Sequence, residues 1–287
     1  MSPRAAGILG GRWYGPAWRR QAGALLGVAV CLGLSLPLPA QTRQEQGKLL
    51  VEKALAALGG EAFLQIRDLV KTGRAYSFYQ ENLRGHAVIT VYERFDAMKP
   101  DAGEEWLPVS RREVYTPKGD YYSLFQNGQG WEVTYRGARP LPQERLRRYR
   151  EATRRDFFYF LRYRFGEPGL YYYHRGVEII DNVPTDAVEI TDSESDTVTV
   201  YFRRSDGLPV QQVYSRLDPK TRVPYEEKTV FSKYRKVGVL TLPWNIRQER
   251  DGEKIFELFG ASIQVNQSLG DDLFRLRQDI DLLPENP

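Results

Sequence analysis

Hydrophobic residues recur at helical spacing near the start of the folded part of the chain. Leucine and alanine fall every three or four residues over 44–58, which predicts an amphipathic helix. Gly59 and Gly60 follow, and glycine supplies the left-handed backbone at which helices commonly end. A short second helical turn over 61–66 then leads into extended chain.

Beyond residue 68 the hydrophobic period changes to two, and β-branched and aromatic residues become frequent. Alternation is clearest where Val198, Val200 and Phe202 interleave with Thr197, Thr199 and Tyr201. Turn residues such as those at 251–252 join the segments closely, so successive strands are expected to pair antiparallel. The predicted strands are 69–80, 83–97, 108–117, 120–126, 130–137, 170–180, 186–192, 196–204, 208–216, 225–236, 241–250 and 253–266.

One long helix over 143–165 interrupts the strands. No repeat, linker or composition break divides the remainder, which predicts a single domain over 41–287. About twelve strands in one sheet should curl toward a barrel. The predicted fold class is α+β, mostly β: a single curled antiparallel sheet, an incomplete barrel of about 11–12 strands, with an N-terminal helix and one inserted covering helix.

The basic excess of the chain lies in its first forty residues. The protein has 41 Lys+Arg against 37 Asp+Glu, and residues 1–40 contain four arginines and no acidic residue. The remainder is balanced, with 37 of each, so charge gives no reason to expect a nucleic-acid partner. The apolar run 22–36 and the small residue Ala40 predict a secretory signal over 1–40, cleaved after Ala40, and export of the chain. An uncleaved anchor within 22–40 and a lipid-modified Cys31 are the alternatives.

Motifs for catalysis or metal binding are absent from the sequence. It contains no nucleophile elbow, phosphate loop or dinucleotide fingerprint. His86 and His174 lie outside any zinc-type spacing. The acidic stretch 192–196 is expected to form a solvated turn, since a calcium loop needs more ligands and a placed glycine. We therefore predict a non-enzymatic protein with no metal or cofactor; a hydrolase site assembled across space is a less favoured alternative.

The inserted helix is both basic and aromatic, and two interpretations stay open. In the first, its apolar stripe is core and its arginines are solvated or paired along the helix. In the second, the helix is a lid over an apolar cavity, and its arginines meet lipid head groups or an anionic partner. The arginines are Arg145, Arg147, Arg148, Arg150, Arg154, Arg155, Arg162 and Arg164.

Three ordered groups of residues resemble the LolA and LolB lipoprotein-carrier family. The segment 127–135, with its Gly-Gln-Gly-Trp sequence, is similar to the family's hairpin before the covering helix. The segment 204–214 resembles the strand–turn–strand that follows, and 234–243 with 263–274 resembles the closing strands and terminal phenylalanine. The family's functional arginine has no secure counterpart here, and Arg94 is the nearest residue.

The resemblance implies a periplasmic carrier that binds lipoprotein acyl chains or lipids and takes part in outer-membrane lipoprotein sorting. It also implies a monomer that meets an inner- or outer-membrane receptor protein. The alternative is an envelope-stress sensor or interaction protein that uses the same half-barrel to detect mislocalised lipoprotein. The residues expected to line the lipid cavity are Tyr92, Arg94, Phe95, Trp131, Leu146, Tyr149, Phe157, Phe160, Leu161, Val198, Val200 and Phe202.

Overall fold

The first helix lies where the leucine and alanine spacing predicts it. The computed structural model describes residues 42–99, 101, 103, 105–218 and 221–285, and the expected signal segment lies outside them. Helix α1 (Arg43–Leu58) begins with a capping box: the Thr42 hydroxyl accepts from the Glu45 N–H, and the Glu45 carboxylate accepts from the Thr42 N–H. Helix α2 (Glu61–Leu64) follows. Neither is long and apolar enough to span a membrane, nor is any other helix of the described residues.

The described residues form one antiparallel sheet of 13 strands, in the order β6-β5-β4-β3-β2-β1-β13-β12-β11-β10-β9-β8-β7. The sheet does not close, because β6 and β7 do not pair with each other. The first six strands are β1 (Asp68–Tyr79), β2 (Asn82–Phe95), β3 (Val109–Val114), β4 (Tyr122–Gln126), β5 (Gln129–Thr134) and β6 (Gly137–Pro140). The other seven are β7 (Tyr171–Ile180), β8 (Val183–Thr191), β9 (Thr197–Arg203), β10 (Pro209–Leu217), β11 (Pro224–Val237), β12 (Leu240–Arg250) and β13 (Glu253–Val265).

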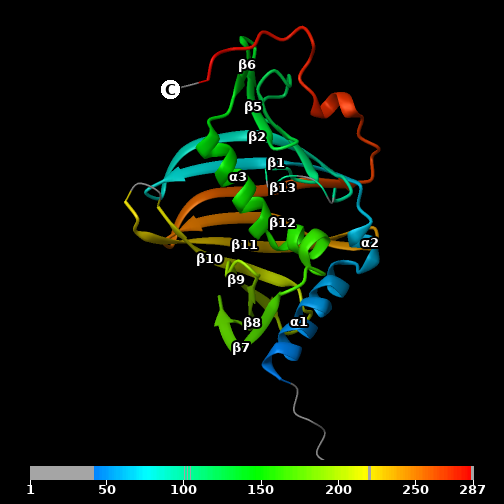
Figure 1. Ribbon diagram of the computed structural model, residues 1–287, viewed down its shortest axis with the longest axis vertical. Coiled ribbons are helices and arrows are strands. Elements are labelled where there is room, and N and C mark those ends of the chain that lie inside the picture. The colour runs from blue at the N-terminus through cyan, green and yellow to red at the C-terminus, as the bar shows by residue number, and fades with distance from the viewer. Residues whose placement is uncertain (1–41, 100, 102, 104, 219–220, 286–287) are drawn as a thin grey trace, which may run out of the picture. The chain divides into compact units, whose positions relative to one another are not determined.

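This strand order explains why a helical segment lies over the sheet. The chain leaves the sheet at its β6 edge and re-enters at the opposite β7 edge, so the connection must pass across one face. That connection consists of α3 (Gln143–Arg155), α4 (Phe157–Tyr159) and a π-helical turn, η1 (Phe160–Arg164). We call these three elements the cover. Figure 1 shows α3 running across the strands at the middle of the sheet.

Two elements differ from the sequence prediction. The single helix expected over 143–165 is broken at Asp156, whose backbone is extended (φ −63°, ψ 129°) and whose carboxylate accepts from the Phe158 and Tyr159 N–H groups. Asp156 thus ends α3 and begins α4 as its N-cap. The short strand β6 was not predicted, because its four residues show no clear alternation and end at Pro140.

The main core lies between α1, the second half of the cover and strands β7 to β9. Val51, Ala54 and Leu58 of α1 are fully buried there, together with Phe157 and Phe202. Helix α1 approaches β7 closely at Gly47, where a Cβ atom would lie 3.1 Å from the backbone of Tyr172. The second half of the cover is therefore fixed by packing, whereas α3 extends away from this core.

Candidate functional site

A cavity of about 480 Å³ lies between the sheet and the cover. Strand side chains alternate between the two faces of the sheet, so every second residue of β1, β2 and β3 points toward the cavity. The cover closes it from the other side through Tyr149 and Thr153 of α3 and Phe158 and Tyr159 of α4. Because Arg145, Ala152 and Gln248 line it and are also exposed, the cavity meets solvent beside α3.

Most of the cavity wall is apolar. Aliphatic and aromatic side chains come from the strands and from α2, and aromatic residues come from the cover. A wall of this kind favours hydrocarbon, since each buried CH₂ group contributes about 0.8 kcal/mol. The residues of α2, of the link after it and of the strands are Phe63, Ile66, Leu69, Val91, Phe95, Val109, Phe125, Leu242, Pro243, Ile246, Leu258 and Ile263.

A paired set of charges crosses one part of the wall, on β2 and β3. Arg111 donates to Glu93 at 2.6 Å and to Glu113 at 2.7 Å, and the Tyr115 hydroxyl donates to Glu113 at 2.7 Å. Burial works to raise the pKa of Glu113, but the Arg111 charge and the Tyr115 hydroxyl outweigh it and hold the pKa below its ordinary value. These groups satisfy one another, and the low pKa keeps Glu113 ionised.

Lys71 also places a charge in the wall, but no carboxylate of the described residues is paired with it. It lies on β1 between Val91 of β2 and Ile263 of β13. Its Nζ donates to the Pro243 carbonyl at 3.5 Å, and it forms no ion pair within the part of the chain that the structure describes. Burial lowers the pKa of Lys71 from 10.5 to about 8, and nearby Glu93 only partly opposes this.

Asp156 places a further carboxylate in the cavity wall, at the break in the cover. Its Oδ1 accepts from the Phe158 and Tyr159 N–H groups, at 3.0 Å each. Burial raises the pKa of Asp156 from 3.8 to about 6, although these two backbone hydrogen bonds favour the ionised form. The carboxylate that shapes the cover is therefore also a cavity group close to its titration range at neutral pH.

Arg162 of η1 fixes the cover to the end of α2. Its guanidinium donates to the carbonyls of Phe63, Leu64 and Ile66 at 2.6–2.9 Å, and it lies over the Phe95 ring at 4.4 Å. These carbonyls belong to a helix end whose own hydrogen bonds are incomplete, so an arginine is well suited to them. Its charge is thus solvated by the backbone and not by a carboxylate.

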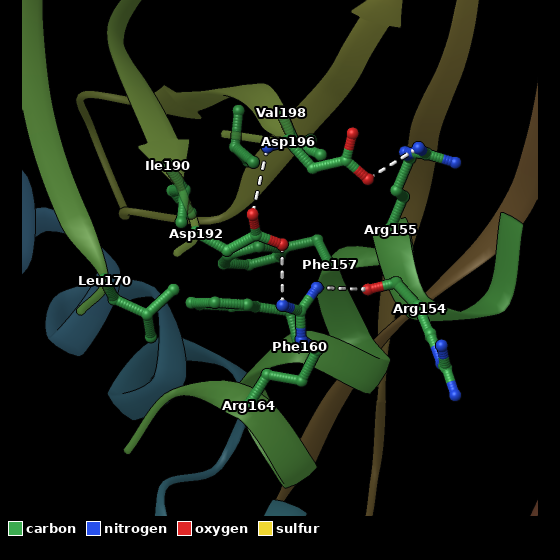
Figure 2. A pocket seen from close by; sticks show the side chains of 11 residues that line it. Arg154, Arg155, Phe157, Phe160, Arg164, Leu170, Ile190, Asp192, Asp196 and Val198 are labelled. Atoms are coloured by element: carbon green, nitrogen blue, oxygen red, sulfur yellow. Dashed lines mark hydrogen bonds and ion pairs between the residues drawn. The ribbon is translucent and has the colours of Figure 1, made fainter. Parts of the chain in front are cut away.

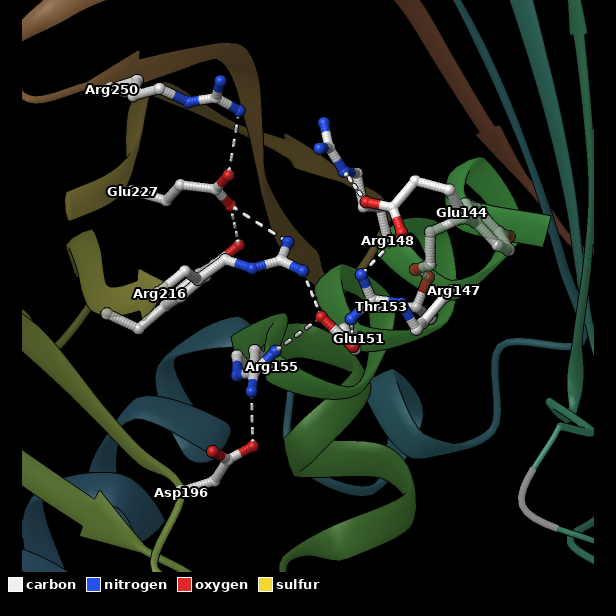
Figure 3. Close-up of polar contacts among 12 residues, drawn as sticks. Glu144, Arg147, Arg148, Glu151, Thr153, Arg155, Asp196, Arg216, Glu227 and Arg250 are labelled. Atoms are coloured by element: carbon white, nitrogen blue, oxygen red, sulfur yellow. Dashed lines mark hydrogen bonds and ion pairs between the residues drawn. The ribbon is translucent and has the colours of Figure 1, made fainter. Parts of the chain in front are cut away.

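The other arginines of the cover are engaged within the chain. Glu144 binds Arg147 and Arg148, as predicted for pairs along a helix. Glu151 binds Arg155 of the cover and Arg216 of β10, which joins α3 to the sheet (Figure 3). Arg145 and Arg150 reach Glu132 and Glu105, and Arg154 also has a partner.

The sequence predicts a solvated turn over 192–196, but in the structure two of its carboxylates bind arginines of the cover. Asp192 accepts from Arg164 at 2.9 Å, and Asp196 accepts from Arg155 at 2.6 Å (Figure 2). Asp192 also accepts from backbone N–H groups of its own turn, which orients it toward the cover. The cover's arginines therefore attach it to the sheet, and the interpretation in which they meet lipid head groups gains no support from these contacts.

The structure places the residues expected to line a lipid cavity in three different surroundings. Phe95 and Tyr149 lie in the wall of the large cavity. Phe157, Phe160, Val198 and Val200 border a crevice of about 20 Å³ near Arg164 (Figure 2), too small for a ligand. The remaining six lie in packed clusters or at the C-terminal segment: Tyr92, Arg94, Trp131, Leu146, Leu161 and Phe202.

Arg94 lies apart from the cavity although both of its neighbours, Glu93 and Phe95, line it. It binds Asp271 at 2.5 Å and Asp96 at 3.2 Å, and its guanidinium lies 5.0 Å from the centre of the Phe274 ring. Since adjacent strand residues face opposite ways, Arg94 points to the outer face.

Sequence reasoning missed Lys71, Arg111 and Asp156. Lys71 follows Val70 in an otherwise apolar strand start, and Asp156 directly precedes an aromatic run, whereas Arg111 lies among polar residues and gave no such signal.

The described residues contain no group of three His, Cys, Asp or Glu side chains placed to hold a metal ion. His86 instead stacks with Tyr76, and His174 lies 3.2 Å from both Gln46 and Asp186. The cavity thus offers hydrocarbon contacts and a few buried charges.

Comparisons with known proteins identify the fold. No protein-family model matches the chain, and no curated protein matches it. A DUF1329 family protein from Desulfovibrio piger superposes with a TM-score of 0.54 at 13% identity, covering 82% of this chain and 98% of that one. A domain named as an outer membrane lipoprotein-sorting protein, from Vibrio parahaemolyticus, superposes with a TM-score of 0.51 at 10% identity, covering 80% and 97%. The LolA-like fold that the sequence motifs predict is therefore confirmed; at these identities the likeness concerns the fold alone.

Proposed function

We propose that the protein is an exported, non-enzymatic carrier that binds an acyl chain in the cavity beneath the cover. The observation that supports this most directly is a space of about 480 Å³ with a largely apolar wall that opens to solvent beside α3. A space of this size is typical of small-molecule sites. Binding needs no cofactor, because the chain only exchanges one apolar environment for another.

The LolA-like fold supports a proposal for the kind of cargo. A structure with the same fold is named for outer membrane lipoprotein sorting, so we propose that the cargo is a lipoprotein acyl chain or a lipid. Export would follow from the signal expected over 1–40, and delivery would require a receptor protein at one of the membranes. The cover would control entry, since α3 borders the opening and is attached by ion pairs in addition to the packing of Leu146 and Tyr149.

The proposal is tested by filling the cavity. Val91 and Val88 lie on the same strand, β2, but Val91 lines the cavity and is 4% exposed, whereas Val88 faces outward and is 60% exposed. Val91→Trp should reduce uptake of the neutral fluorescent probe N-phenyl-1-naphthylamine at least tenfold. Val88→Trp, the matched control, should leave uptake unchanged.

Native mass spectrometry of the purified protein provides an independent measurement, because a carrier should retain lipid that the Val91→Trp variant has lost. Thermal unfolding of both variants establishes that they fold. Wild-type protein that takes up no probe and carries no lipid would refute the proposal, as would equal uptake by the two folded variants.

A further inference from the structure

The Lys71 side chain places an ammonium group in an apolar part of the cavity wall, where it has too few hydrogen-bond partners. An ammonium can donate three hydrogen bonds, yet the one acceptor found for it in the described structure is the Pro243 carbonyl at 3.5 Å. Its neighbours across the sheet are Val91 and Ile263, and Leu69 shares its face of β1. A buried charge without a counter-charge is unfavourable, so this arrangement favours a ligand that supplies one.

The charges around the cavity point to the sign of that ligand. Four cationic and three carboxylate side chains line it, but Arg145 is paired with Glu132 outside the wall and Arg162 donates to three backbone carbonyls, so Lys71 is the cation of the described wall with the fewest partners. Two of the carboxylates are held by Arg111, and Asp156 accepts from backbone N–H groups, so none of them is bound to Lys71. The seven side chains are Lys71, Arg111, Arg145, Arg162, Glu93, Glu113 and Asp156.

The volume of the cavity limits the size of the ligand. At about 480 Å³ it falls within the range of small-molecule sites and is large enough for one acyl chain with a small head group.

We infer that the cavity takes a single-chain amphiphile with a monoanionic carboxylate head group, and that Lys71 Nζ binds this carboxylate. The inference rests on the acyl-chain function proposed above and names its ligand class. With the carboxylate at Lys71, the chain lies against the apolar residues on either side, Leu69, Val91 and Ile263. A neutral head group would leave the ammonium without its counter-charge, and a cationic one would repel it.

The test compares ligands that share a chain and differ in head-group charge. Decanoate, 1-decanol and decyltrimethylammonium are titrated into the purified protein by calorimetry, with acetate as a head group lacking the chain. A charge-assisted hydrogen bond predicts that wild-type protein binds decanoate about tenfold or more tighter than 1-decanol. Decyltrimethylammonium should bind most weakly, and acetate should not bind.

Three variants assign the preference to Lys71. Lys71→Met keeps an unbranched side chain without the charge, and should weaken decanoate binding about tenfold and abolish the preference for decanoate over 1-decanol. Lys71→Arg keeps the charge and should retain the preference for decanoate. Lys236→Met removes an exposed lysine of β11 and is the matched control, expected to behave as wild type.

The outcomes separate the inference from the function on which it rests. Equal binding of decanoate and 1-decanol by wild-type protein overturns the role of Lys71 but leaves the acyl-chain site intact. A preference for decanoate that survives in Lys71→Met overturns it as well. Acetate binding as tight as decanoate binding would show an anion site without a chain site. If no decyl ligand binds, the proposed function itself is refuted.

Discussion

Replacing Asp156 by asparagine should stabilise the protein at neutral pH without undoing the break in the cover. The Asp156 Oδ1 accepts from the Phe158 and Tyr159 N–H groups at 3.0 Å each. The side-chain oxygen of asparagine accepts the same bonds and is an equally good N-cap. The substitution therefore removes the buried charge and keeps the cap.

The size of the effect follows from linkage between protonation and folding. Burial raises the pKa of Asp156 from 3.8 to about 6, so between these values the folded state holds a proton that the unfolded state has lost. Stability consequently falls as the pH rises through this window, and the cost persists above pH 6. At 1.36 kcal/mol per pH unit, the cost at pH 7 is about 3 kcal/mol. Asp156→Asn avoids it.

Urea unfolding of wild type and Asp156→Asn at pH 4, 5, 6 and 7, followed by tryptophan fluorescence, measures this cost. The stability difference in favour of the variant should grow from near zero at pH 4 to about 3 kcal/mol at pH 7. Asp101→Asn, at an exposed position, controls for the loss of one carboxylate. A difference that does not change with pH, or one that favours wild type increasingly toward pH 7, would refute the reasoning.

Two further substitutions test how the cover is held. In Gly130→Val, the added Cβ would lie 2.7 Å from Leu146 Cδ2 and 2.9 Å from Leu141 Cδ1, so we expect a loss of about 1–3 kcal/mol in urea unfolding; unchanged stability would contradict close packing of α3 on β5. Arg162→Met removes the guanidinium from three carbonyls, of which only that of Phe63 keeps a backbone donor among the described residues, the Ile66 N–H, and should cost about 3 kcal/mol, or a fall of about 6–12 °C in the unfolding temperature. A fall of under 2 °C would show that water replaces the guanidinium.

Strands and the first helix were predicted to within a few residues, because their hydrophobic periods are regular. Twelve of the thirteen strands coincide with predicted segments, for instance 253–266 against β13 (Glu253–Val265). The exception, β6, is too short to show a period. The sequence does contain a signal for the break at Asp156, since an aspartate before an aromatic run is a typical helix N-cap. The continuous apolar stripe of the expected helix concealed it.

The cavity wall was harder to predict than the fold. Glu93 pairs with Arg111 across β2 and β3 and points inward with it, but this follows only once the strand register is known. Sequence reasoning instead chose aromatic and aliphatic residues, many of which fill the core. Val200 and Phe202 alternate as predicted and are almost fully buried, because α1 and α4 pack on that end of the sheet and leave no space there.

The ionic attachment of α3 has a consequence for how the cavity can open. Its contacts with the acidic turn, with Arg216 and with the strands on the other side are between partly exposed groups, apart from the packing around Leu146 and Tyr149. Such pairs contribute little individually and are screened by dissolved salt. α4 and η1, in contrast, are held chiefly by buried phenylalanines, in addition to the ion pair of Arg164 with Asp192. The cover therefore consists of a part held mainly by apolar packing and of α3, whose ion pairs with the rest of the fold weaken as the ionic strength rises.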